Sequence, residues 1–288
     1  MKTDTTEKGL ESLIMKHMTG SDGFFSSPTT TVAEAEPKKA GSGWFAGSPA
    51  AYDREFCVDT EQLFAFLQTT QPEEYAKLGV SGFTDKKSMA RQKFLARLQG
   101  EITRRGVIDV LRRGIKHEAL SFDLFYGTPS PENAKAVARH AMNRFSITRQ
   151  LRYSREETKR ALDLCAFING LPVITFELKN SLTKQTVADA VEQYKRDRDA
   201  KEPLFQFGRC VVHFAVDDHE VAMCTELKGT KGMAKDSWFL PFNQGWNDGA
   251  GNPPNPDGIK TDYLWKRCLL YTSPSPRDRT RSRMPSSA

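Results

Sequence analysis

The sequence lacks the features that define several classes of protein. Its five cysteines show no Cys-x-x-Cys spacing, which argues against a disulfide framework or a zinc site; they are Cys57, Cys165, Cys210, Cys224 and Cys268. No apolar run approaches the roughly 18 residues that a membrane helix needs. The first residues have neither the basic start nor the apolar stretch of a signal peptide. These absences predict a cytoplasmic globular protein whose thiols are reduced and buried.

The C-terminal segment, residues 268–288, does not read as natural protein. Residues 268–278 can be the in-frame translation of a transposon-type sequencing adapter, and residues 282–288 that of its flow-cell end, with residues 279–281 at the sample barcode. We therefore treat the segment as non-native read-through, expect it to be disordered, and expect the native sequence to continue beyond Arg267. Its four arginines and one aspartate account for three units of the net charge of +6, so charge alone says little about a nucleic-acid partner.

Turn residues and hydrophobic periodicity predict one α/β domain over residues 1–267, with a mixed central β-sheet flanked by helices. Helices are expected over residues 5–20, after Asp59, and over 72–79, 86–105, 131–143 and 183–198. Strands are expected over residues 121–126, 145–153, 162–168, 171–178, 211–216 and 220–225. Residues 20–51 are rich in Gly, Ser, Thr, Pro and Ala, and we expect them to form an irregular or mobile connection.

Three charged residues stand out in the most apolar part of the sequence. Asp163 lies in one predicted strand, and Glu177 and Lys179 lie in the next. Burying a lone charge costs several kcal/mol unless it is paired or binds a metal. Two carboxylates can hold Mg²⁺, which polarises a phosphate and activates a bound water, while a lysine can orient that water. A salt-bridged structural pair is the alternative, since Glu-x-Lys is common by chance.

The turn between these strands decides whether the three residues meet. Glu177 and Lys179 share a face because strand side chains alternate. A regular two-residue turn at Asn169-Gly170 would leave Asp163 on the opposite face. We therefore predict a three-residue turn, with Asp163 opposite Thr175, or a bulged connection.

With this set of residues, the sequence resembles the N-terminal endonuclease region of the restriction subunit of type I restriction–modification enzymes. The similarity extends from Thr6 to Trp265. Its segments are residues 70–72, 110–114, 148–151, 167–172, 177–180, 193–194, 212–217, 239–243 and 249–253.

The resemblance implies a restriction-endonuclease-like core of the Asp…Glu-x-Lys type, with Mg²⁺ as cofactor. It implies that Asp163 and Glu177 are metal ligands and that all three charged residues are catalytic. It also implies an acidic accessory residue in the first helix, which is either Glu7 or Glu11. The family's Gln-x-x-x-Tyr motif is only partly kept, because Gln193 is followed by Asp at position 197.

The family further implies double-stranded DNA as substrate, and modification (methyltransferase) and specificity subunits as partners. Its ATP-driven translocase domains would lie in the missing sequence, since no phosphate-binding Gly-x-x-x-x-Gly-Lys-Ser/Thr loop occurs here. Basic residues suggest DNA contacts; the candidates are Arg149, Arg152, Lys195 and Arg196. The alternatives are a nuclease of another defence or repair system, and a nuclease-like module that binds DNA or docks subunits without catalysis.

Overall fold

The computed structural model describes residues 7–24, 41–80, 82, 85–156, 159–229 and 232–270. The predicted read-through from position 271 onward lies outside this range, as do residues 25–40 of the predicted connection. Cys268, the first residue of the predicted read-through, ends a π-helical turn over Leu264–Cys268. Within the described residues, no helix combines the length and the apolar character needed to cross a membrane.

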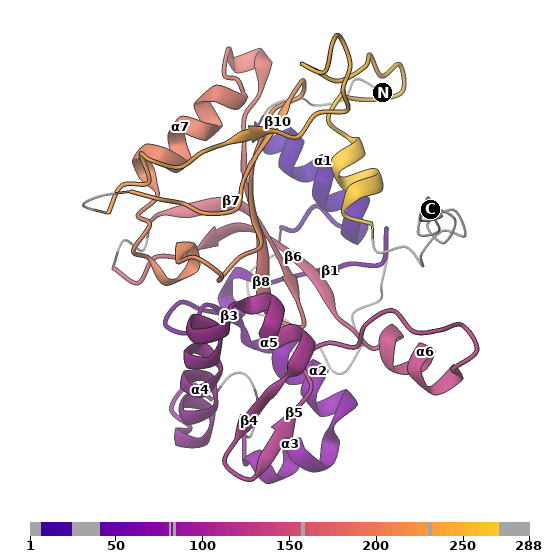
Figure 1. Ribbon diagram of the computed structural model, residues 1–288, viewed down its shortest axis with the longest axis vertical. Coiled ribbons are helices and arrows are strands. Elements are labelled where there is room, and N and C mark those ends of the chain that lie inside the picture. Colours follow the sequence, from indigo (N-terminus) through magenta and orange to yellow (C-terminus); the bar gives the residue numbers. More distant parts are fainter. Residues whose placement is uncertain are drawn as a thin grey trace, which may run out of the picture.

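A mixed sheet forms the centre of the described chain (Figure 1). Its seven strands follow the order β1-β6-β7-β8-β9-β10-β11. The pairs β1/β6 and β8/β9 are parallel, and the other four pairs are antiparallel. The strands are β1 (Phe45–Ala46), β6 (Phe145–Arg152), β7 (Ala161–Ile168), β8 (Leu171–Leu178), β9 (Val212–Val216), β10 (Val221–Cys224) and β11 (Leu240–Pro241). The predicted mixed sheet flanked by helices is confirmed.

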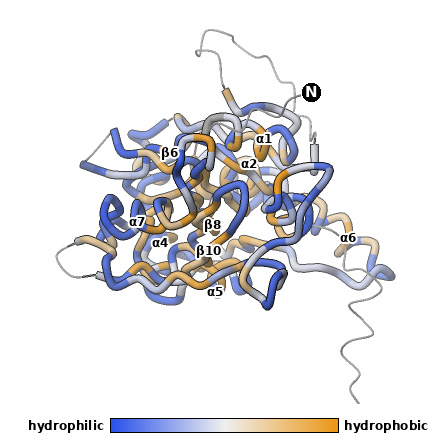
Figure 2. The backbone as a smooth tube through the Cα atoms, turned by 90° about the horizontal axis from the view of Figure 1, so that it is seen from above, coloured by the Kyte–Doolittle hydropathy of each residue, from blue (hydrophilic) through white to orange (hydrophobic). Residues whose placement is uncertain are grey.

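Two helices cover opposite faces of this sheet. Helix α1 (Glu7–Thr19) packs Leu10 and Ile14 against the face that carries Leu164 and Phe176. Helix α7 (Val187–Asp197) connects the parallel strands β8 and β9, and its Tyr194 packs on the other face. The central strands are therefore packed against apolar residues on both sides. Figure 2 shows hydrophobic residues along β8 and β10 in the interior of the molecule.

A helical subdomain lies at one end of the sheet and builds a second core (Figure 1). It contains α2 (Thr60–Thr70), α3 (Pro72–Leu78), α4 (Met89–Arg105) and α5 (Val107–Arg113), with the hairpin of β4 (Ile115–His117) and β5 (Leu120–Phe122). Strands β2 (Tyr52–Asp53) and β3 (Val58–Asp59) link it to the sheet, and α6 (Ala134–Ala141) lies at the periphery.

Several sequence predictions need correction. Residues 20–51 were expected to be irregular, but β1, within that segment, adds an edge strand to the central sheet. Strand β2, just beyond the segment, pairs with β3 and was not predicted either. Helix α5 and the strand β4 were not predicted. Helix α7 begins at Val187 rather than at residue 183, because Ser181–Thr183 form a 3-10 turn and Thr186 supplies the capping box.

Candidate active site

The β7–β8 hairpin combines a two-residue turn with a bulge. Asn169 and Gly170 have φ values of 50° and 80°, the left-handed conformations of a type I′ turn. Phe167 pairs with Pro172, yet Ala166 pairs with Ile174, so the ladder shifts by one residue. Val173 is the extra residue on β8, and its carbonyl accepts a hydrogen bond from Val211 N at 2.8 Å.

The bulge decides which side chains meet. Beyond it, the paired ladder ends with Leu164 opposite Phe176, and continuing this register by one step places Asp163 opposite Glu177. Residues that face each other across an antiparallel pair point to the same side of the sheet. The predicted bulged connection is thus confirmed, whereas the three-residue turn and the pairing of Asp163 with Thr175 are wrong.

Glu177 is fully buried and held by an arginine that the sequence analysis did not identify. Arg198, the residue after α7, donates from Nε to Glu177 Oε1 at 2.6 Å, and its Nη2 lies in ion-pair contact with the same oxygen, also at 2.6 Å. Its Nη2 also donates to Ala161 O at 2.9 Å, and its guanidinium lies 5.5 Å from the ring of Tyr153. The second carboxylate oxygen, Glu177 Oε2, is buried without a hydrogen-bond partner.

A signal for Arg198 was present in the sequence. Ala190, Tyr194 and Arg198 are spaced by four residues and therefore lie on one stripe of the helix. Ala190 and Tyr194 are fully buried, so an arginine on the same stripe needs a buried acidic partner. The same stripe confirms that Tyr194 packs in the core, where its hydroxyl lies 2.8 Å from Thr175 Oγ1.

Asp163 on β7 and Lys179, just after β8, are each 7% exposed. Asp163 Oδ2 accepts a hydrogen bond from Leu178 N at 2.7 Å, which ties the carboxylate to the end of β8. Lys179 directly follows β8, and its backbone N–H donates to Val216 O at 2.8 Å. The structure therefore brings all three predicted residues to one end of the hairpin.

Gln150 is a second residue that the sequence did not reveal. It faces Asp163 on β6, at the one step missing from a ladder that pairs Arg149 with Leu164 and Leu151 with Leu162. Its φ of 49° is rare for a residue other than glycine. Gln150 Nε2 donates to Glu11 Oε1 at 2.7 Å and lies 3.4 Å from Asp163 Oδ1, so one amide bridges two carboxylates.

Helix α1 contributes Glu11, which is 1% exposed. Arg149 forms a buried ion pair with Glu11 Oε2 at 2.8 Å and donates to Asp22 O at 2.7 Å. Because Arg149 is buried and paired with Glu11, it is not placed to contact a DNA phosphate. Glu7 starts the same helix, but its side chain lies outside the described part of the structure.

Burial raises the pKa of two of these carboxyl groups. The pKa of Glu177 rises to about 8, and burial is the largest cause. The charge of Arg198 opposes the shift, and the charge of Asp163 adds to it. The pKa of Glu11 rises to about 7, again mainly through burial and then through Asp163, while Arg149 opposes the shift. Carboxylates that repel one another in a buried site favour the arrival of a cation.

The donors fit a divalent cation with few protein ligands. In the described residues, no three His, Cys, Asp or Glu side chains form a ready metal cluster. Two features nevertheless suit Mg²⁺: the buried, unpartnered Glu177 Oε2, and Asp163 on the same face. Magnesium commonly binds one or two carboxylates and keeps several waters.

The other predicted residues lie on or near α7. Gln193 is half-buried. Arg152 is exposed on β6, and the exposed Arg196 pairs with Glu192 at 2.8 Å. Lys195 is half-buried and lines a cavity of about 490 Å³ between α7, β10 and residues 237–243.

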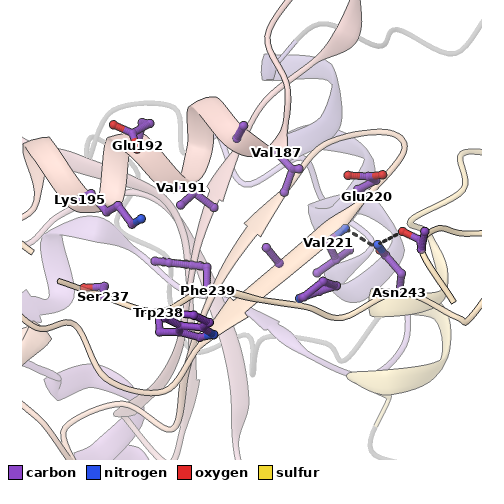
Figure 3. Close-up of a pocket in the computed structure, with 14 residues that line it drawn as sticks. Val187, Val191, Glu192, Lys195, Glu220, Val221, Ser237, Trp238, Phe239 and Asn243 are labelled. Atoms are coloured by element: carbon purple, nitrogen blue, oxygen red, sulfur yellow. Dashed lines mark hydrogen bonds between the residues drawn. The ribbon is translucent and has the colours of Figure 1, made fainter. Parts of the chain in front are cut away.

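That cavity is separate from the site formed by Asp163, Glu177 and Lys179. Figure 3 shows Val187 and Val191 of α7 facing Phe239 across it, with Trp238 beneath. Asn243 closes one end by accepting a hydrogen bond from Val221 N at 3.0 Å. Asp163, Glu177 and Lys179 do not line it. His213 is likewise a core residue, since it is 2% exposed and Thr175 Oγ1 lies 2.7 Å from its Nδ1.

Comparison with known proteins identifies the family. The family described as type I restriction enzyme R protein N terminus matches residues 88–232, a span that holds Asp163, Glu177, Lys179 and Arg198. The type I restriction enzyme HindI endonuclease subunit of Haemophilus influenzae is 36% identical over 72 residues, which are 24% of this chain and 7% of that subunit. No solved structure matches. The chain therefore belongs to the family of type I restriction enzyme R protein N-termini.

Proposed function

We propose that this chain is the DNA-cutting domain of a type I restriction subunit and hydrolyses phosphodiester bonds with the help of Mg²⁺. The observation that carries the proposal is the Val173 bulge, which aligns Asp163 with Glu177 at the end of β8. A ladder without this shift would separate the two carboxylates. The mixed sheet flanked by helices agrees with a restriction-endonuclease-like core, which we include in the proposal.

Each residue has a distinct role in this mechanism. Glu177 Oε2 and Asp163 would hold the cation, and the hydrogen bond from Leu178 N orients Asp163. Bound Mg²⁺ would supply Lewis acidity to the phosphate and a more acidic water. Lys179 directly follows β8. Its ammonium group can orient that water or stabilise negative charge on the phosphate oxygens during cleavage.

Glu11 is the accessory acid that we propose from the first helix. Its carboxylate shares Gln150 with Asp163, and the negative charge of Asp163 raises its pKa. Gln193 remains a candidate accessory residue, because it lies on α7 beside the buried Tyr194. The surface candidates for DNA phosphates are Arg152, Lys195 and Arg196.

The wider assignment follows from the family. We propose that the complete subunit couples cleavage to ATP-driven translocation of double-stranded DNA, and that it works with modification and specificity subunits in the cytoplasm. The chain spans only 7% of the curated relative it matches, so these functions concern sequence outside this chain.

The test uses the full-length subunit assembled with its partners. Glu177→Ala or Lys179→Ala should abolish DNA cleavage while ATP hydrolysis continues, since the motor lies elsewhere. Lys228→Ala, which removes an exposed lysine paired with Glu226, is the matched control and should cut normally. Cleavage by either site variant would refute the assignment. A wild-type complex that binds DNA in Mg²⁺ without cutting it would favour the docking module instead.

A further inference from the structure

We infer that Arg198 is a positioning residue that makes Glu177 a one-oxygen ligand and thereby selects Mg²⁺ over Ca²⁺. This inference rests on the proposed function, because it concerns the same cation site. It adds a residue and a property that the Asp163, Glu177 and Lys179 set does not contain.

The two oxygens of Glu177 have different surroundings. Two nitrogen atoms of Arg198 lie 2.6 Å from Oε1: Nε donates a hydrogen bond to it, and Nη2 is in ion-pair contact with it. Oε2 is buried and has no hydrogen-bond partner in the described chain. A fully buried carboxylate with one oxygen engaged by a cationic side chain can offer only the other to a metal ion.

Arg198 is itself firmly held. Its guanidinium donates to Ala161 O at the start of β7 and to Tyr153 Oη at 3.4 Å. Tyr153 is 1% exposed and packs against Phe205, with ring centroids 4.8 Å apart. Glu177 therefore meets a guanidinium held by Tyr153, directly after β6, and by Ala161 at the start of β7. If Glu177 turned to present both oxygens to a metal, it would lose its contacts with Arg198.

Ligand number distinguishes the two ions. Ca²⁺ accepts six to eight oxygens and often takes both oxygens of one carboxylate, whereas Mg²⁺ requires compact octahedral coordination and retains its waters. A carboxylate limited to one oxygen therefore disfavours Ca²⁺ more than Mg²⁺. Removing Arg198 also removes a positive charge, but that change affects two divalent ions similarly and cancels in the ratio of their affinities.

The experiment measures metal binding rather than cleavage. Mn²⁺ binding to the 288-residue chain is followed by electron paramagnetic resonance, and Mg²⁺ and Ca²⁺ are titrated as competitors. Arg198→Met should raise the preference for Ca²⁺ over Mg²⁺ by about tenfold, the scale on which residues behind a metal ligand act. Arg198→Lys should give a smaller rise in the Ca²⁺ preference, because an ammonium group keeps the positive charge but cannot contact Glu177 Oε1 through two nitrogen atoms.

Arg91→Met is the matched control. Arg91 is also buried and ion-paired, with Asp53 at 2.7 Å, but it lies in the helical subdomain. It should reproduce the loss of stability and leave the Ca²⁺ to Mg²⁺ ratio unchanged. If Arg198→Met does not fold, the ratio in Arg198→Lys decides.

The outcomes separate the two proposals. Glu177→Gln should weaken binding of both ions, which supports the site itself. If Glu177→Gln does so while the Arg198 variants keep the wild-type ratio, the inference is overturned and the proposed site stands. An equal shift in Arg91→Met would overturn it as well. Absence of Mn²⁺ binding by the wild-type chain would overturn both.

Discussion

The two ends of the β7–β8 hairpin use the same pair of strands for different purposes. At the closed end, Ile168 and Leu171 pack against the helical subdomain, and the buried Asn169 has its side chain satisfied by Arg144 N and Leu124 O. At the open end, buried carboxylates lie beside one another and Glu177 Oε2 has no partner. The closed end therefore consists of packed and hydrogen-bonded groups, whereas the open end holds buried charge.

The Val173 bulge lies between these ends and connects them. The closed end sets the register through the turn, and the bulge then shifts it so that the two carboxylates align. Buried groups with strongly perturbed pKa values gather at functional sites, and for that reason we place the proposed function at the open end.

The largest effect is expected at the closed end, from Gly170→Ala. Gly170 has φ of 80°, and a Cβ there would lie 2.4 Å from Asp59 O and 2.6 Å from Leu63 N. Backbone strain and overpacking together should lower the free energy of unfolding by roughly 4 kcal/mol. Gly79→Ala is the control, because its φ of 70° is similar but nothing lies within 4 Å, and it should cost about 1 kcal/mol. Equal losses in urea unfolding would contradict the packing argument.

A smaller loss is expected when the charges at the open end are separated. Arg198→Met leaves Glu177 without its counter-ion and should lower the free energy of unfolding by roughly 3 kcal/mol. The double variant Glu177→Gln/Arg198→Met should recover most of this loss, since no buried charge remains unpaired. Thermal unfolding of both variants measures the coupling. A double variant as unstable as the sum of the single variants would show that the pair contributes through packing instead.

The pH dependence of the closed end should be dominated by Asp59, which caps α2 and donates its N–H to Gly170 O. Burial raises its pKa from 3.8 to about 7. Between the two pKa values the folded state keeps a proton that the unfolded chain releases. The free energy of unfolding therefore falls as the pH rises from 3.8 to about 7. Asp59→Asn removes this titrating group. The free energy of unfolding of the variant, relative to that of the wild type, should rise by at most about 1.4 kcal/mol per pH unit between pH 5 and 7.

Chemical denaturation at a series of pH values checks this result. Asn can still cap the helix, so the variant separates charge from capping. Asp257→Asn, at an exposed position, is the control and should leave the profile as it is. An advantage for Asp59→Asn that does not change with pH would show that Asp59 keeps its charge when folded.

The smallest change in stability is expected on the outer face of α7. Arg196→Gln removes an exposed pair with Glu192 and should alter the free energy of unfolding by less than about 0.5 kcal/mol. If Arg196 contacts a phosphate in the assembled complex, the slope of log K against log salt should fall by about 1. An unchanged slope would remove Arg196 from the DNA surface while leaving the comparison between the hairpin ends intact.

Much of the fold could be predicted because its signals are local. The alternating pattern of β6 and the apolar runs of β7 and β8 were predicted within one residue of their ends. Strand β1 was missed because two residues in a Gly- and Ser-rich segment carry no periodic signal. Helix α5 was missed for a similar reason: it has seven residues between Gly106 and Gly114, too few to show a clear stripe.

For the site, the sequence alone pointed to the three charged residues that we propose carry the chemistry. Charges at Asp163, Glu177 and Lys179 within apolar strands required a partner or a metal, and strand parity set Glu177 and Lys179 on one face. The same parity argument showed that Asp163 needed an irregular connection. These conclusions hold because strand alternation and the cost of burying charge do not depend on distant parts of the chain.

Only the tertiary structure decided how that requirement is met. It placed the irregularity at Val173, brought Glu11 to Gln150 across 139 positions, and brought Arg198 to Glu177 across 21. Such contacts depend on how helices pack on the sheet, and no local pattern encodes that packing. The physical reason is that a buried carboxylate accepts any well-placed cationic or amide donor, and the fold determines which donor is within reach.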